Sequence, residues 1–150
     1  MNPAHLHLIF NHVPIVGSFF ALVLLGVGLL RRNETLTRAG LVAVLAAAIM
    51  CIPAQLTGEG AEEVIEDRLN ISHHLIHEHE EAAEVGFVAL EITGALALFG
   101  LLLLGRRSPK STLVAGLTLA GAVVSFGLLA RAGNLGGEIS HPELRTEKAG

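Results

Sequence analysis

The fold is decided by one long apolar stretch, AAEVGFVALEITGALALFGLLLL, which runs from Ala82 to Leu104. A helix needs roughly 20 apolar residues to cross the hydrocarbon core of a bilayer, and this stretch is long enough to do so. Three further apolar blocks of similar length occupy residues 13–30, 39–56 and 112–130. The sequence therefore predicts an all-α protein, a bundle of four transmembrane helices that forms a single domain of 150 residues.

The basic residues predict how this bundle is oriented. Residues 31–38 carry three arginines, and residues 105–111 carry two arginines and a lysine. Short loops rich in Lys and Arg stay in the cytoplasm. We therefore expect the segment 57–81, the tail 133–150 and both termini to be extracytoplasmic. The expected location is the inner membrane of a bacterium, with the lipid bilayer as a partner and no role in binding nucleic acid.

Histidine and carboxylate side chains gather at this outer end. All eight histidines lie there, and none falls in the two basic loops or deep inside an apolar block. Imidazole is a ligand for zinc, copper, nickel and haem iron, and carboxylates add oxygen donors. The sequence therefore predicts a metal or haem site. The candidate metal ligands are His5, His7, His12, His73, His74, His77, Glu80, Glu84 and His141.

The densest part of this pattern precedes the third apolar block. At helical spacing, one strip of side chains contains His73, His77, Glu80, Glu84 and Glu91. His79 faces away from this strip. Glu84 and Glu91 continue it into the apolar block, where a carboxylate is costly and normally faces a partner or a cavity. We expect these two residues to form a proton or ion path.

The first hypothesis for the cofactor is b-type haem used in electron transfer. Bis-histidine ligation takes one imidazole from each of two facing helices, a geometry that bundles provide. We expect His12 to pair with His73 or His77, and Arg131 to pair with a haem propionate or with Glu84. A site at the outer face is too far from the cytoplasm to carry electrons across alone. The expected partners are a quinol or a redox protein, in an oligomer or a larger complex.

Two other readings stay open. A non-haem site for Zn, Fe, Cu or Ni would use two or three histidines with Glu80 and Glu84, in metal sensing or transport. A structural membrane subunit would need no cofactor. The sequence contains no nucleophile with a paired base, no phosphate-binding loop and no nucleotide fingerprint. We therefore do not expect the chain to be a catalyst alone, although it could serve as an electron-transfer subunit.

A family resemblance rests on three short motifs. They are His12-Val-Pro-Ile15 followed by Phe19-Phe20-Ala21-Leu22, then Leu56-Thr-Gly58 with Ala61 nearby, then the histidine-bearing start of the third apolar helix. Over residues 5–130 the chain resembles the DUF2231 family of small four-helix bacterial membrane proteins. The resemblance implies haem binding, with His12 and one of the histidines that open the third helix as ligands. The dense run 73–84 and the tail with His141 depart from the family pattern.

Overall fold

The computed structural model describes residues 3–69 and 73–141, with side chains for residues 4–64 and 73–141. Its four long helices are α1 (Pro3–Leu30), α2 (Glu34–Leu56), α4 (His73–Gly105) and α5 (Ser111–Ser140). A shorter helix, α3 (Gly58–Leu69), follows α2 after Thr57. All four long helices are long and apolar enough to cross a membrane. The prediction of an all-α bundle of four transmembrane helices is confirmed.

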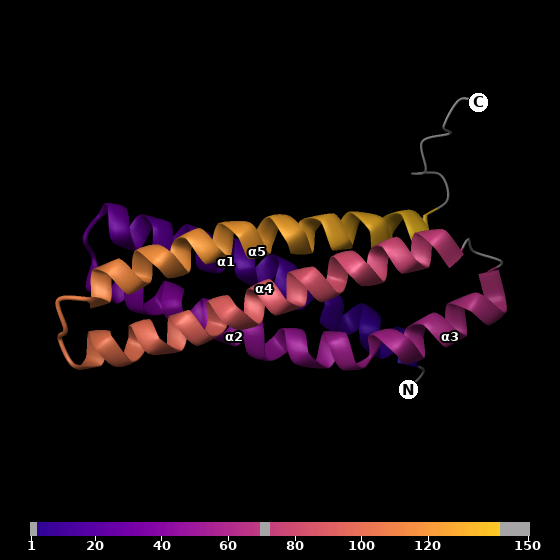
Figure 1. The fold of residues 1–150 in the computed structure, drawn as a ribbon, viewed down its shortest axis with the longest axis horizontal. Helices are drawn as coiled ribbons and strands as arrows, with labels where there is room; N and C mark the ends of the chain where they lie inside the picture. The colour runs from indigo at the N-terminus through magenta and orange to yellow at the C-terminus, as the bar shows by residue number, and fades with distance from the viewer. Residues whose placement is uncertain (1–2, 70–72, 142–150) are drawn as a thin grey trace, which may run out of the picture.

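The order of the helices around the bundle decides which side chains can meet. Helix α1 packs against α2 and α5, and helix α4 packs against the same two helices. Helices α1 and α4 are therefore diagonally opposite. The two short connections lie at one end of the bundle, whereas α3, the start of α1 and the end of α5 lie at the other (Figure 1). We call this second end the histidine-rich end, because the described histidines lie toward it.

The packing is that of a bundle in lipid. Large apolar side chains such as Phe20 and Leu102 are more than half exposed, and small side chains fill much of the interior. The central cluster consists of Ala21, Leu25, Leu41, Val44, Ala97, Ala115 and Ala122. Two helix backbones approach closely at Gly40, where an added Cβ would lie 2.6 Å from the Cα of Leu25. The outer surface of the four helices suits the acyl chains of a bilayer.

The two basic connections are built alike. Arg32 and Arg107 both have a positive φ, 49° and 52°, in the left-handed region. The next residue in each loop, Asn33 or Ser108, donates its N–H over 2.9 Å to the carbonyl of the fifth residue before it. These bonds satisfy carbonyls that a helix end leaves free. The chain thus consists of two similar hairpins, α1–α2 and α4–α5, joined through α3.

Two boundaries differ from those expected. Helix α2 begins at Glu34, before the expected start at residue 39, because the Asn33 side chain caps it by accepting from the Leu36 N–H over 3.0 Å. Helix α5 passes the expected end at residue 130 and continues to Ser140. The segment 133–150 therefore begins as helix rather than as a tail beyond the bundle, and residues 142–150 are outside the described part. Likewise, the segment 57–81 is mostly α3 and the first turns of α4, with residues 70–72 outside the description.

Candidate functional site

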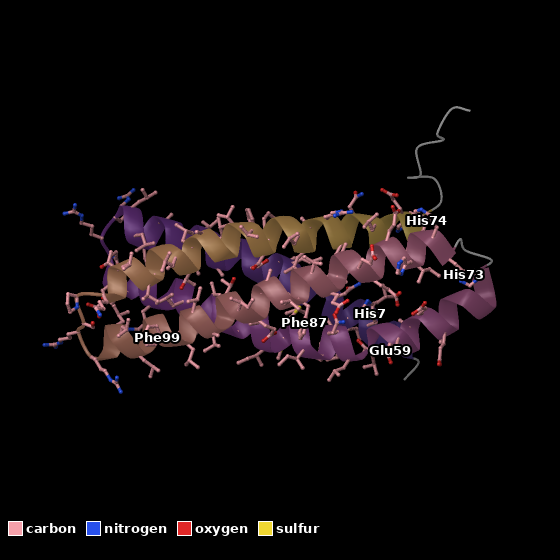
Figure 2. All side chains as sticks on the ribbon, viewed as in Figure 1. His7, Glu59, His73, His74, Phe87 and Phe99 are labelled. Atoms are coloured by element: carbon pink, nitrogen blue, oxygen red, sulfur yellow. The ribbon has the colours of Figure 1, made fainter. Side chains whose placement is uncertain are left out.

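Only two of the eight histidines are partly buried. His7 and His79 are shielded, whereas the others are exposed. Figure 2 shows His73 and His74 at the tip of the histidine-rich end, with His7 further along the bundle toward Phe87. At this end, α1 and α4 therefore each contribute one partly buried imidazole.

The ring of His7 is held by the second helix of its own hairpin. Its Nδ1 lies 3.1 Å from the carbonyl oxygen of Ala54 and 3.3 Å from the Oγ1 of Thr57. A carbonyl oxygen can only accept, so Nδ1 carries the proton and donates it. In the neutral ring, the Nε2 lone pair is then available, and no described residue forms a hydrogen bond with it.

The ring of His79 is held in the same way. Its Nδ1 lies 2.9 Å from the carbonyl oxygen of Ala132, in the second helix of the other hairpin. The ring lies against Gly136, where an added Cβ would come within 3.1 Å of Cε1. The ring of His7 lies beside Gly58, with a corresponding distance of 3.9 Å. In each hairpin, this glycine is the fourth residue after the one whose carbonyl accepts the hydrogen bond.

These two imidazoles come from diagonally opposite helices at the same end of the bundle. They are close enough for a charge on His79 to act on His7. Metal-binding histidines commonly donate their other ring N–H to a carbonyl, which fixes the tautomer and the ring orientation. Both His7 and His79 have such a hydrogen bond, so each ring offers a fixed Nε2 atom as a possible metal ligand.

The expected pairing of His12 with a histidine of α4 is not observed. His12 is exposed, and its Nδ1 lies 3.3 Å from the carbonyl of Leu8 in its own helix. Its ring borders an open apolar groove on α1 that is lined by Val13, Val16, Gly17 and Phe20. This groove faces outward, so His12 meets the surroundings of the bundle rather than its interior.

The exposed histidines of α4 contact carboxylates of the same helix. His74 Nδ1 lies 3.5 Å from Glu78 Oε2, and His77 Nε2 lies 3.3 Å from Glu81 Oε1. Both are contacts across one turn, between side chains four residues apart. His73 is exposed, and its charge acts on Glu62 of α3. These imidazoles therefore belong to the surface of the histidine-rich end.

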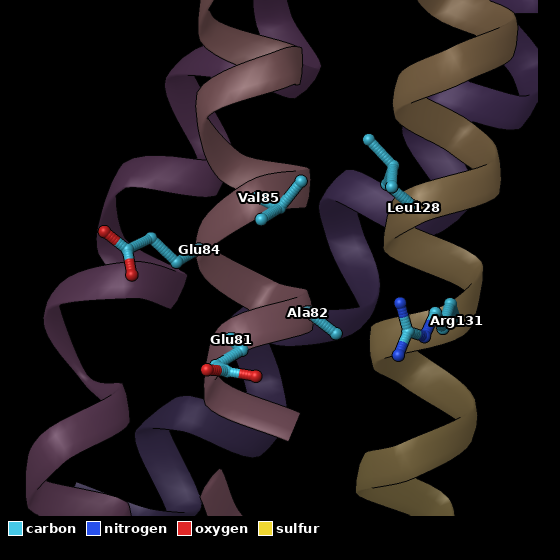
Figure 3. Close-up of a pocket in the computed structure, with 6 residues that line it drawn as sticks. All are labelled: Glu81, Ala82, Glu84, Val85, Leu128 and Arg131. Carbon is cyan, nitrogen blue, oxygen red and sulfur yellow. The ribbon is translucent and has the colours of Figure 1, made fainter. Parts of the chain in front are cut away.

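The expected oxygen donors do not complete a metal centre. The carboxyl of Glu80 lies close enough to that of Glu62 on α3 to act on it, and Glu84 points toward the side of α4 on which α2 and α3 lie (Figure 3). Within residues 3–69 and 73–141, no group of three or more His, Cys, Asp or Glu side chains could hold a metal ion. The nine candidate ligands thus do not converge as one set in the described part of the chain.

Arg131 lies in a groove of about 350 Å³ between α4 and α5 (Figure 3). The groove is lined by Glu81, Ala82, Glu84, Val85, Leu128 and Arg131. Figure 3 shows the Glu84 carboxylate on the side of α4 that faces away from Arg131. Among the described residues, Arg131 forms no ion pair with Glu84, so the expected pairing of these two residues is not observed.

Two polar side chains deeper in the bundle each have a buried oxygen atom with no hydrogen-bond partner among the described residues. The two atoms are Oδ1 of Asn11 and Oε1 of Glu91. The thiol of Cys51 on α2 is buried, and Glu91 is close enough for its charge to act on that thiol. Buried polar atoms normally have a partner, so each of these oxygens requires an explanation.

His79 was absent from the sequence-based ligand set, although a signal for it existed. It lies on the helical face of α4 that also contains Ile76, Ala82, Gly86 and Leu90, all buried. Spacings of three and four residues join these positions. A search along the buried face, rather than along the acidic strip, would have selected His79. The carbonyl partners of the two histidines could not be read from side-chain patterns.

Comparison with known proteins found no matching family model, no similar curated protein and no similar solved structure. The resemblance to the DUF2231 family therefore remains a prediction from the short motifs.

Proposed function

We propose that the chain is an integral membrane protein that binds b-type haem at the histidine-rich end of its bundle and serves in electron transfer. The observation that supports this proposal is the matched pair His7 and His79. Each is partly buried, each has its Nδ1 fixed by a carbonyl of the neighbouring helix, and each keeps Nε2 free among the described residues. The pair replaces the His12 pairing that the sequence suggested.

The number of donors favours haem over a bare metal ion. A structural zinc site needs four ligands, and a catalytic one needs three from the protein. Two imidazoles are enough for haem, because the porphyrin supplies the other four nitrogen atoms. The described side chains supply two fixed donors and no group of three. Bound haem would supply a one-electron iron couple, and the protein would supply its axial ligands and a partly apolar setting.

The surroundings of the two imidazoles fit this role. A hydrogen bond from Nδ1 to a carbonyl raises the basicity of the free nitrogen and prevents the ring from turning. The glycines beside the rings leave room for the imidazoles in these positions. Arg131 lies in its groove without an ion pair to any described residue and remains the candidate partner for a propionate. By the positive-inside rule we expect the arginine-rich connections to lie in the cytoplasm and this end outside it, where a quinol or redox protein would exchange electrons.

The test is a haem titration of the purified protein, with a matched set of histidine variants. His7→Ala and His79→Ala should each abolish the low-spin spectrum, because each removes one axial ligand. His74→Ala and His12→Ala are the controls, and both should bind haem like the unmodified protein. Loss of binding in a control, with retention in both core variants, would overturn the assignment.

A second candidate function is the binding of a divalent metal ion at the surface. Its supporting observation is the pair of exposed contacts His74–Glu78 and His77–Glu81, each with a nitrogen and an oxygen donor. Such a site would take Zn, Fe, Cu or Ni, and its ion would be lost in a His74→Ala, His77→Ala double variant. Haem binding would survive in that variant, which separates the two proposals. A protein that binds neither haem nor metal would be a structural membrane subunit.

A further inference from the structure

Glu91 is an acidic side chain in an apolar setting. The apolar blocks 13–30, 39–56, 82–104 and 112–130 contain three titratable residues, namely Cys51, Glu84 and Glu91. They contain no Lys, Arg or His, so no cationic side chain within these blocks is available to pair with Glu91. Helices α1 and α5 contribute no titratable group at all over these blocks, and α2 contributes only the Cys51 thiol.

The contacts of Glu91 make a charged state costly. One carboxyl oxygen, Oε1, is buried and has no hydrogen-bond partner among the described residues. Nearby side chains on this part of the α2–α4 interface are apolar, and Phe87 packs onto a buried cluster that includes Cys51 and Leu90. An ionised carboxylate without a counter-ion in such surroundings takes up a proton instead.

We propose that Glu91 is a proton-binding site, which holds an exchangeable proton inside the bundle and receives it from the histidine-rich end. This inference concerns a site apart from His7 and His79, and it needs no cofactor. Glu62 and Glu80 form a pair of neighbouring carboxyl groups at the surface of that end, where water has access to them.

The side of α4 that faces α2 and α3 connects this pair to Glu91. Glu80, Glu84 and Glu91 are spaced by four and seven residues, so they follow one line along the helix. At the helical rise, successive members are about 6 Å and about 10 Å apart along the axis. Glu80 and Glu84 are exposed, whereas Phe87, which lies between Glu84 and Glu91 in the sequence, is partly buried against the apolar cluster.

The decisive experiment is infrared spectroscopy of the haem-free, full-length protein in lipid. The carbonyl stretch of a protonated carboxylic acid should be present in the unmodified protein and absent from Glu91→Gln, which is nearly the same size. Glu84→Gln is the matched control and should retain the band. Transfer to heavy water should shift the band, because the proton exchanges. Absence of the band, or a band that does not shift, would overturn the proposal.

A chemical measurement gives an independent decision. A hydrophobic carbodiimide reacts with protonated carboxyls in apolar surroundings, whereas a water-soluble carbodiimide reacts with exposed ones. Mass spectrometry should find the hydrophobic reagent on Glu91 and the water-soluble reagent on Glu63, which is exposed on α3. Labelling of Glu91 by the water-soluble reagent alone would show an ordinary exposed carboxylate. Both measurements are made without haem, so they stand whether or not the haem proposal survives.

Discussion

His7 and His79 occupy equivalent positions in the two hairpins of the bundle. Each donates Nδ1 to a backbone carbonyl in the second helix of its hairpin, over 3.1 Å and 2.9 Å, and each ring lies beside the glycine four residues later. The hairpin loops are also alike, with a left-handed arginine in each. His7 and His79 therefore have matching local surroundings in the two hairpins.

The two glycines beside these rings predict unequal effects of the same substitution. Gly136→Ala would place a Cβ within 3.1 Å of the His79 ring, which must then shift, whereas Gly58→Ala leaves 3.9 Å to the ring of His7. We expect Gly136→Ala to weaken haem affinity by about tenfold or more, since about 1.4 kcal/mol corresponds to a factor of 10. Gly58→Ala should be close to neutral. Equal affinities in a haem titration would contradict the ring placement.

The docking of α3 should depend on pH through Glu62 and Glu80. The neighbouring Glu80 carboxyl and then desolvation raise the pKa of Glu62, so a rise in pH through that pKa leaves two carboxylates that repel each other. Because the pKa is raised in the folded protein, the stabilisation is present at low pH and is lost as pH rises. We expect amide hydrogen exchange in α3 to become faster as the pH rises from acid to neutral, relative to a matched rate in α5.

The control for this pH effect is Glu62→Gln. An amide can donate to Glu80 whatever the pH, so α3 should stay protected at neutral pH in this variant. Exchange that is independent of pH in the unmodified protein would show that the carboxyl pair does not hold α3.

The orientation in the membrane can be tested by cysteine labelling. The chain has a single cysteine, Cys51, which Cys51→Ser removes. In this background, we expect Glu63→Cys on α3 to react with an impermeant maleimide in spheroplasts, and Lys110→Cys to react only after lysis. Both positions are exposed. The reverse pattern would place the histidine-rich end in the cytoplasm.

Core packing predicts a difference between two leucines of α4. Leu90 is fully buried, and Leu90→Ala should lower the free energy of unfolding by about 2–5 kcal/mol through the cavity that it leaves. Leu98 is 48% exposed on the lipid-facing side, so Leu98→Ala should cost much less. Unfolding in mixed micelles measures both. Equal losses would mean that Leu90 does not lie in the core.

The sequence predicted the fold better than the site, for physical reasons. A spanning helix is fixed by length and hydropathy, which are properties of the chain itself, so the four spans were recoverable. The end of α5 could not be predicted in the same way. Gly136 suggests that the helix stops there, but Gly136 packs against His79 and the helix continues to Ser140. His79 can be identified as a candidate ligand only when it is known which face of α4 is buried. The backbone carbonyls of Ala54 and Ala132, which hold the two rings, cannot be predicted from the pattern of side chains.

The most direct test of the central claim is an absorption spectrum of the detergent-purified protein, first oxidised by air and then reduced with dithionite. The haem proposal predicts a Soret band with sharp α and β bands on reduction, as two imidazole ligands give to low-spin haem b. Protein that is colourless when purified from haem-replete cells, and stays colourless when haem is added, would contradict it.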